Sequence, residues 1–206
     1  MTPLAIAAAA AVLVGMAMSL RASNGRLSVA GLGLTLIALP LAAGGTPELL
    51  VLAFRTVALL LAVFILDHAV RRTTALVGPI RLGGTAETGL VAAGFVLGAL
   101  LGATIPDPRI PAIPLGTAVA LLLGGGTLIA FAADTLRLGI GCMLLVAAGA
   151  AIVPALGGRA DAGLQLALAG CEVAIAGAVG WLAIQGAHVR HDLELANRPR
   201  DLRDAG

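Results

Sequence analysis

Two charged side chains, Glu172 and Arg55, stand well away from the ends of long apolar stretches, and their types suggest chemistry. Placing either one in hydrocarbon costs at least about 2.5–3.5 kcal/mol on insertion scales, so each points to a function. A carboxyl group at Glu172 is expected to be neutral much of the time, because desolvation disfavours its charged form. Such a group can accept and release protons as a relay. The alternative is a protonated side chain that only hydrogen-bonds a neighbouring helix.

The guanidinium of Arg55 is a fixed positive charge, because it does not lose its proton in proteins. It lies roughly 10 Å into its apolar stretch at the helical rise per residue. Two roles stay open on the sequence alone. Arg55 either tunes the protonation of a carboxylate on another subunit or extends its charged end toward the outer membrane surface.

Three weaker candidates, Asp67, His68 and Asp134, lie at the edges of apolar stretches. Asp67 and His68 are placed to admit protons at the cytoplasmic edge, although a solvated helix end is the simpler interpretation. Asp134 and Arg137 are three residues apart, so we expect them to form a simple surface ion pair.

Several classes of site are excluded by the residues that are present. All thirteen basic residues are arginine, so the chain holds no P-loop lysine and no Schiff-base lysine. The two cysteines, Cys142 and Cys171, have no CxxC spacing, which argues against a disulfide framework, a zinc site or a cluster. No HExxH, GxSxG or paired-carboxylate motif occurs. We therefore expect no catalytic residue, no metal, no cofactor and no nucleic-acid partner for this chain.

The elements that must position these residues are membrane-spanning helices. Of the 206 residues, 59% are hydrophobic and only 12% are charged, about half the charged share of a soluble domain. A crossing helix needs about 20 apolar residues. We predict an all-α, polytopic membrane protein with seven such helices, at residues 3–20, 27–43, 48–66, 86–105, 112–133, 136–156 and 163–187. The two helices on either side of Asp134 are separated by barely a turn.

The distribution of arginine predicts the orientation of these helices. Ten arginines fall on the odd-numbered connections and the tail: Arg21, Arg26, Arg71, Arg72, Arg81, Arg137, Arg190, Arg198, Arg200 and Arg203. Only Arg109 and Arg159 fall on the other side. Because cytoplasmic loops are enriched in basic residues, we expect the N-terminus outside and the C-terminus in the cytoplasm. The first stretch lacks a basic region before it, so we expect it to remain as a helix rather than to be cleaved.

Small residues are expected to hold the helices together, because lipid provides no hydrophobic drive for their association. Gly94, Gly98 and Gly102 form two overlapping GxxxG steps on one helix face. Packing inside the bundle is the favoured interpretation, and a seam with a partner subunit is the alternative.

The last helices resemble a known family. The segments DTLRLGIGCMLL at residues 134–145 and AGCEVAIAGAVG at 169–180 resemble the last two helices of subunit K of respiratory complex I, a three-helix unit that also occurs in multisubunit sodium/proton antiporters. The length, the seven helices, AFRT at 53–56 and the tail segments HVRHDL and DLRDAG look more like component E of hydrogenase-4 and formate hydrogenlyase.

This resemblance implies three parts: a four-helix membrane extension at 1–110, a three-helix subunit-K-like unit at 111–187, and a cytoplasmic tail at 188–206. It also implies an accessory subunit of a redox complex in the bacterial inner membrane, beside antiporter-like and quinone- or hydrogenase-module subunits. Glu172 matches the carboxylate on the last helix of the family. The second family carboxylate would fall near Leu144 and is absent here.

Two other functions remain open. One is a stand-alone small transporter or channel, for which internal repeats of broken helices would be expected and none is detected. The other is a structural anchor that docks a soluble redox partner through its arginine-rich loops.

Overall fold

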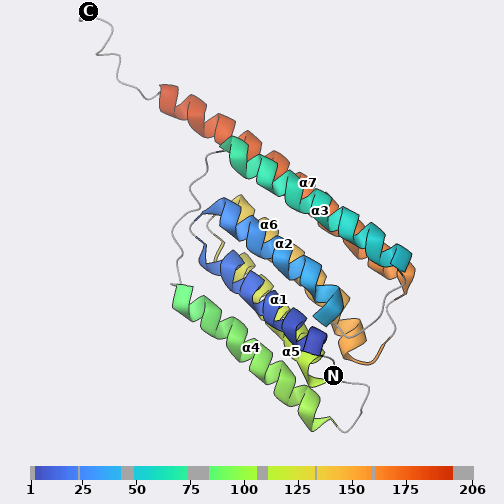
Figure 1. Ribbon diagram of the computed structural model, residues 1–206. Helices are drawn as coiled ribbons and strands as arrows, with labels where there is room; N and C mark the ends of the chain where they lie inside the picture. The colour runs from blue at the N-terminus through green and yellow to red at the C-terminus, as the bar shows by residue number, and fades with distance from the viewer. Residues whose placement is uncertain are drawn as a thin grey trace, which may run out of the picture.

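The computed structural model describes residues 3–22, 24–42, 49–73, 84–105, 111–132, 134–158 and 161–196, with side chains up to residue 187. These residues form seven α-helices and no strand (Figure 1). The helices are α1 (Pro3–Arg21), α2 (Gly25–Ala42), α3 (Leu49–Thr73), α4 (Gly84–Thr104), α5 (Ala112–Ala130), α6 (Thr135–Ala155) and α7 (Ala162–Ala196). The predicted all-α class is confirmed.

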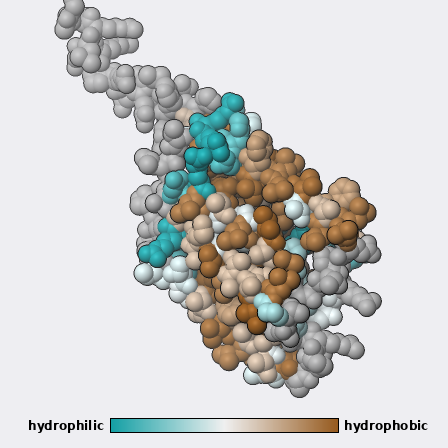
Figure 2. Space-filling view, viewed as in Figure 1, coloured by the Kyte–Doolittle hydropathy of each residue, from teal (hydrophilic) through white to brown (hydrophobic). Residues whose placement is uncertain are grey.

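Every one of these seven helices is long and apolar enough to cross a membrane. Large apolar side chains also cover the outside of the molecule, as Figure 2 shows over α2 and α3. An exposed apolar surface of this extent is stable only in contact with lipid or with other membrane proteins. The chain is therefore a multi-pass membrane protein, as the composition predicts.

The helices pack in two layers (Figure 1). One layer runs α4, α1, α2, α3, and the second runs α5, α6, α7 behind it. The closest pairings are α1 with α2, α4 with α5, α5 with α6, and α3 with α7. Because successive helices alternate in direction, α3 and α7 run parallel, and together they form one edge of the bundle.

Close helix approach depends on glycine, as expected for a bundle in lipid. A methyl group at Gly98 of α4 would lie 2.8 Å from the Leu115 carbonyl oxygen, and one at Gly102 would lie 2.8 Å from the Cα atom of Ala112. At Gly94 the nearest atom, also at 2.8 Å, belongs to Leu123. All three glycines therefore lie against α5 within the bundle. The small-residue face of α4 thus packs against another helix of the same chain.

Some predicted helix boundaries are wrong by several residues. The sequence predicts that the fifth helix reaches residue 133, but α5 ends at Ala130; the Asp134 side chain caps the start of α6 at Thr135. It predicts that the third helix ends at residue 66, whereas α3 continues to Thr73 and includes Asp67 and His68. The apolar stretch predicted at 163–187 agrees with the seventh candidate span, Ala162–Ala187, and α7 continues beyond it to Ala196. Charged residues end an apolar run without ending the helix.

The predicted break at Gly157 and Gly158 has a clear physical basis. Gly157 adopts φ 76°, a left-handed conformation that glycine reaches at no steric cost. The Gly158 N–H donates to the Val153 carbonyl and the Gly157 N–H to the Pro154 carbonyl, both at 3.0 Å. This Schellman arrangement pairs carbonyl groups that the end of α6 would otherwise leave free.

Candidate functional site

The candidate site lies between α3 and α7, where the fold brings Glu172 and Arg55 together. A methyl group at Gly180 of α7 would lie 3.2 Å from Ile65 of α3, which fixes the register of the two helices. Counting back equally along these parallel helices places Glu172 level with Val57, within one turn of Arg55. The two charges are close enough to attract each other.

Glu172 is almost completely enclosed. It is 1% exposed, and neither carboxyl oxygen has a hydrogen-bond partner among the described residues. Buried polar atoms are nearly always hydrogen-bonded, so two orphan oxygens on one side chain call for an explanation. Within the described residues, no donor group forms a hydrogen bond to Glu172. The side chain therefore does not link two helices by a hydrogen bond there.

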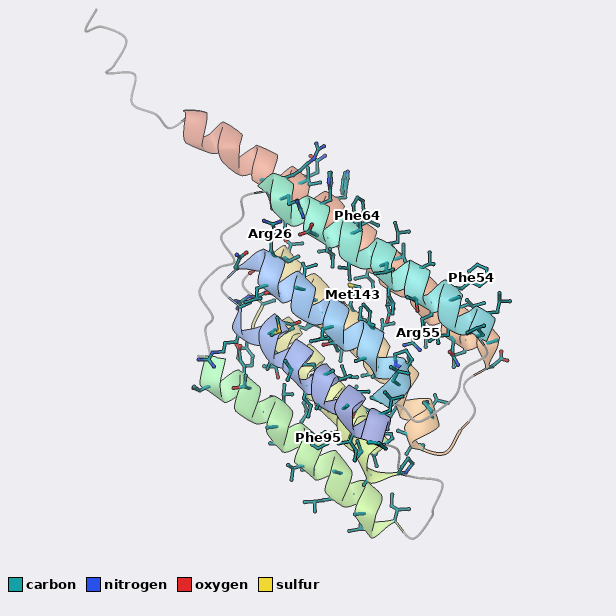
Figure 3. The ribbon with its side chains drawn as sticks, in the orientation of Figure 1. Arg26, Phe54, Arg55, Phe64, Phe95 and Met143 are labelled. Atoms are coloured by element: carbon teal, nitrogen blue, oxygen red, sulfur yellow. The ribbon has the colours of Figure 1, made fainter. Side chains whose placement is uncertain are left out.

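Arg55 is also buried, at 8% exposure, and Figure 3 shows it on α3 beside the end of α2. Its enclosure within the bundle does not favour extension of the charged end to the outer membrane surface. A carboxylate that attracts it, that of Glu172, is on its own chain. The sequence does not predict this pairing, because neither helix alone indicates that α3 packs against α7.

The arrangement holds an ionisable carboxyl group beside a permanent cation, away from bulk water. A carboxyl group can accept and release a proton, whereas an arginine keeps its charge in proteins. The chemistry available to the site is therefore proton exchange.

A second group of buried charges lies at the other end of the bundle, where α1 ends and α4 and α6 begin. Arg137 is 3% exposed and Glu87 is 4% exposed, and the two attract each other. Arg137 also lies 3.6 Å from Asp134 and donates a 3.4 Å hydrogen bond to the Ala22 carbonyl. The expected simple surface pair of Asp134 and Arg137 is wrong in this respect, because the end of α1 covers the guanidinium.

Sequence reasoning did not single out Glu87. It stands near the start of an apolar stretch, where a glutamate normally faces water. One of its oxygens is buried without a hydrogen-bond partner in the described structure. Asp134 acts as the N-cap of α6, since its carboxylate accepts a 2.8 Å hydrogen bond from the Arg137 backbone N–H.

Asp67 and His68 lie on the last two turns of α3, remote from Glu172. Asp67 accepts from the Nε of Arg71 at 2.6 Å and lies 3.7 Å from the Nε of Arg26. His68 is exposed and stacks on Phe64, with ring centroids 6.2 Å apart. Within the described part of the chain, no group of three histidine, cysteine or acidic side chains is placed to hold a metal ion.

No protein-family model matches the chain, and neither a curated protein nor a solved structure matches it.

Proposed function

We propose that this chain is an accessory membrane subunit of a redox-driven complex of the hydrogenase-4 or complex I type, in which Glu172 takes part in proton translocation. The observation that carries the proposal is the buried carboxyl group of Glu172, without hydrogen-bond partners among the described residues and attracted by Arg55 across α3 and α7. The segments at 134–145 and 169–180, which resemble subunit K, support the assignment to such a complex. Redox centres and quinone would belong to other subunits.

The cell location follows from the same proposal. A redox complex of this type resides in the bacterial inner membrane, with antiporter-like and hydrogenase- or quinone-module subunits as neighbours. The resemblance divides the chain at residue 110, and Arg55 and Glu172 lie on different parts, on α3 and α7 respectively. The four-helix extension would thus supply the cation for a carboxyl group on the subunit-K-like unit.

Purification of a tagged chain in mild detergent tests the assembly. We expect other membrane subunits to co-purify in fixed ratio. Recovery only as a monomer or homo-oligomer would favour a stand-alone transporter or channel. Recovery with a soluble redox protein alone would favour a structural anchor.

Two variants of Glu172 test the proton role in the assembled complex. A neutral glutamate and a glutamine are nearly isosteric, so Glu172→Gln keeps the shape but removes proton exchange. Glu172→Leu removes hydrogen bonding as well. A relay requires that both variants lose proton-coupled turnover while complex yield with Gln is retained. Cys171→Ala, a change at the adjacent exposed position, is the matched control and should behave as wild type. Normal coupling in the Gln variant would exclude the relay.

A further inference from the structure

The ends of α2 and α3 form a cluster of arginines that the proton-exchange proposal does not use. Arg26 lies in the first turn of α2, and Arg71 and Arg72 lie in the last turn of α3. The two helix ends are in close contact, since a methyl group at Gly25 would lie 3.2 Å from Val70. Arg26 and Arg71 therefore reach one place, the carboxylate of Asp67, from different helices. Figure 3 shows Arg26 at the start of α2.

One carboxylate positions both guanidinium groups. Asp67 contacts the Nε of Arg71 through one oxygen, at 2.6 Å, and approaches the Nε of Arg26 with the other, at 3.7 Å. Each guanidinium has further N–H donors on its terminal nitrogens. The side chains of Arg26 and Arg71 are 56% and 58% exposed, so these donors are accessible from outside.

The cluster keeps a positive excess. Arg26 and Arg71 bring two positive charges against the single negative charge of Asp67, and Arg72 follows Arg71 in the sequence. A phosphate diester fits such a site, because planar guanidinium groups form paired hydrogen bonds to phosphate oxygens. The ligand chemistry that complements the cluster is thus an anionic phosphate.

The surface next to the cluster changes from polar to apolar along α3. One turn from Arg71 the exposed His68 stacks on Phe64, and Phe64 is 66% exposed. Leu27, beside Arg26 in sequence, is 47% exposed. Figure 2 shows the hydrophilic end of the molecule passing directly into a hydrophobic surface. A ligand with a phosphate head and apolar chains matches both parts.

We propose that Arg26 and Arg71, held by Asp67, bind the phosphate of an anionic phospholipid whose acyl chains lie along Leu27 and Phe64. The site is independent of Glu172. It joins the end of α3 to the start of α2.

Native mass spectrometry of the full chain in non-ionic detergent tests this site. Phosphatidylglycerol and phosphatidylcholine with identical acyl chains are added at equal concentration. We expect phosphatidylglycerol to be retained preferentially. An arginine near a lipid surface is worth about 1 kcal/mol, so Arg26→Gln and Arg71→Gln should each weaken its binding about fivefold.

Arg21→Gln is the matched control, because Arg21 is exposed at the same end of the bundle and makes no ion pair with Asp67 in the described structure. This variant should bind phosphatidylglycerol as wild type does. An equal loss with Arg21→Gln would show a general charge effect and overturn the proposal. Two results with the wild-type chain would also overturn it. One is equal retention of phosphatidylcholine. The other is displacement of phosphatidylglycerol by inorganic phosphate at the same concentration.

Discussion

At the scale of single residues, the candidate site depends on two buried charged side chains, Arg55 and Glu172. Burying one charge without the other carries a large desolvation cost, and a nearby opposite charge offsets part of it. The two groups attract each other without forming one of the close ion pairs seen elsewhere in the described chain. Glu172 can therefore lose its charge without breaking a direct bond to Arg55. A close, fully hydrogen-bonded ion pair would oppose such a change of charge.

A double-mutant cycle measures this coupling. We expect Arg55→Gln and Glu172→Gln to destabilise the chain separately, and the double variant to lose less than the sum. The coupling should be about 1 kcal/mol, within the range for neighbouring charges. The free energy of unfolding in mixed micelles provides the readout. Strictly additive effects would mean that the two residues act independently.

The sequence identifies Glu172 and Arg55 individually, because a charge in an apolar stretch is costly and therefore conspicuous. It does not identify them as partners, since their proximity depends on the packing of α3 against α7. Glu87 escapes notice, and Arg137 is expected on the surface, for a related reason. Each stands near the end of an apolar stretch, where water is the default surrounding, and only the assembled bundle buries them.

At the scale of elements, Arg137 links several helix ends. Its guanidinium donates to the end of α1 through the Ala22 carbonyl and attracts Glu87 at the start of α4. A cation near the C-terminal carbonyls of a helix also interacts favourably with the helix dipole. Arg137 thus secures α1, α4 and α6 at one end of the bundle.

Replacement of Arg137 should therefore be costly. We expect Arg137→Met to lower the free energy of unfolding by about 3 kcal/mol, because it leaves the Glu87 carboxyl group buried without this cation. Arg72→Met, at an exposed arginine of α3, should change it by less than about 0.5 kcal/mol. Chemical unfolding of both variants in detergent checks the difference. Similar values would show that Arg137 is dispensable at the helix ends.

The glycines of α4 provide a second test with a control on the same helix. An added methyl group at Gly98 would overlap the Leu115 backbone, whereas one at Gly89 would meet no atom within 4 Å. We expect Gly98→Ala to destabilise the chain by about 1–3 kcal/mol through overpacking. Gly89→Ala should be neutral or slightly stabilising, because alanine favours helix. Melting temperatures in detergent distinguish the two, and an unchanged Gly98→Ala would mean that α5 can move away.

Helix number is well predicted from the sequence, because the apolar length needed to cross a membrane is a strict requirement. Helix ends are less well predicted. Charged turns such as Asp67–Arg71 stay helical, since an i,i+4 ion pair supports the helix outside the apolar layer. The start of α6 depends on one capping side chain, Asp134, whose hydrogen bond is local and could be anticipated.

At the scale of the whole molecule, the two-layer bundle has an uneven construction. The helices α1, α2, α4, α5 and α6 pack extensively with one another, and α3 and α7 pack chiefly together at one edge. The Arg55–Glu172 pair lies within that edge, and the Arg26–Asp67 contact joins it to α2. Movement of the α3–α7 edge would therefore change the surroundings of Glu172 directly, while the rest of the bundle stays in place.

The positions of the arginines predict the orientation of the bundle in the membrane. Arg21, Arg26, Arg71, Arg72 and Arg137 all belong to the end of the bundle where α1 and α3 finish and α2 and α6 begin. Basic residues are retained on the cytoplasmic side during insertion, so this end should face the cytoplasm. Reporter fusions after Ala187 should read as cytoplasmic, and fusions near Pro47, Asp107 and Gly158 as external. An external reading after Ala187 would reverse the bundle. It would place the Arg26–Asp67–Arg71 cluster in the outer leaflet and bring Arg55 toward the cytoplasm.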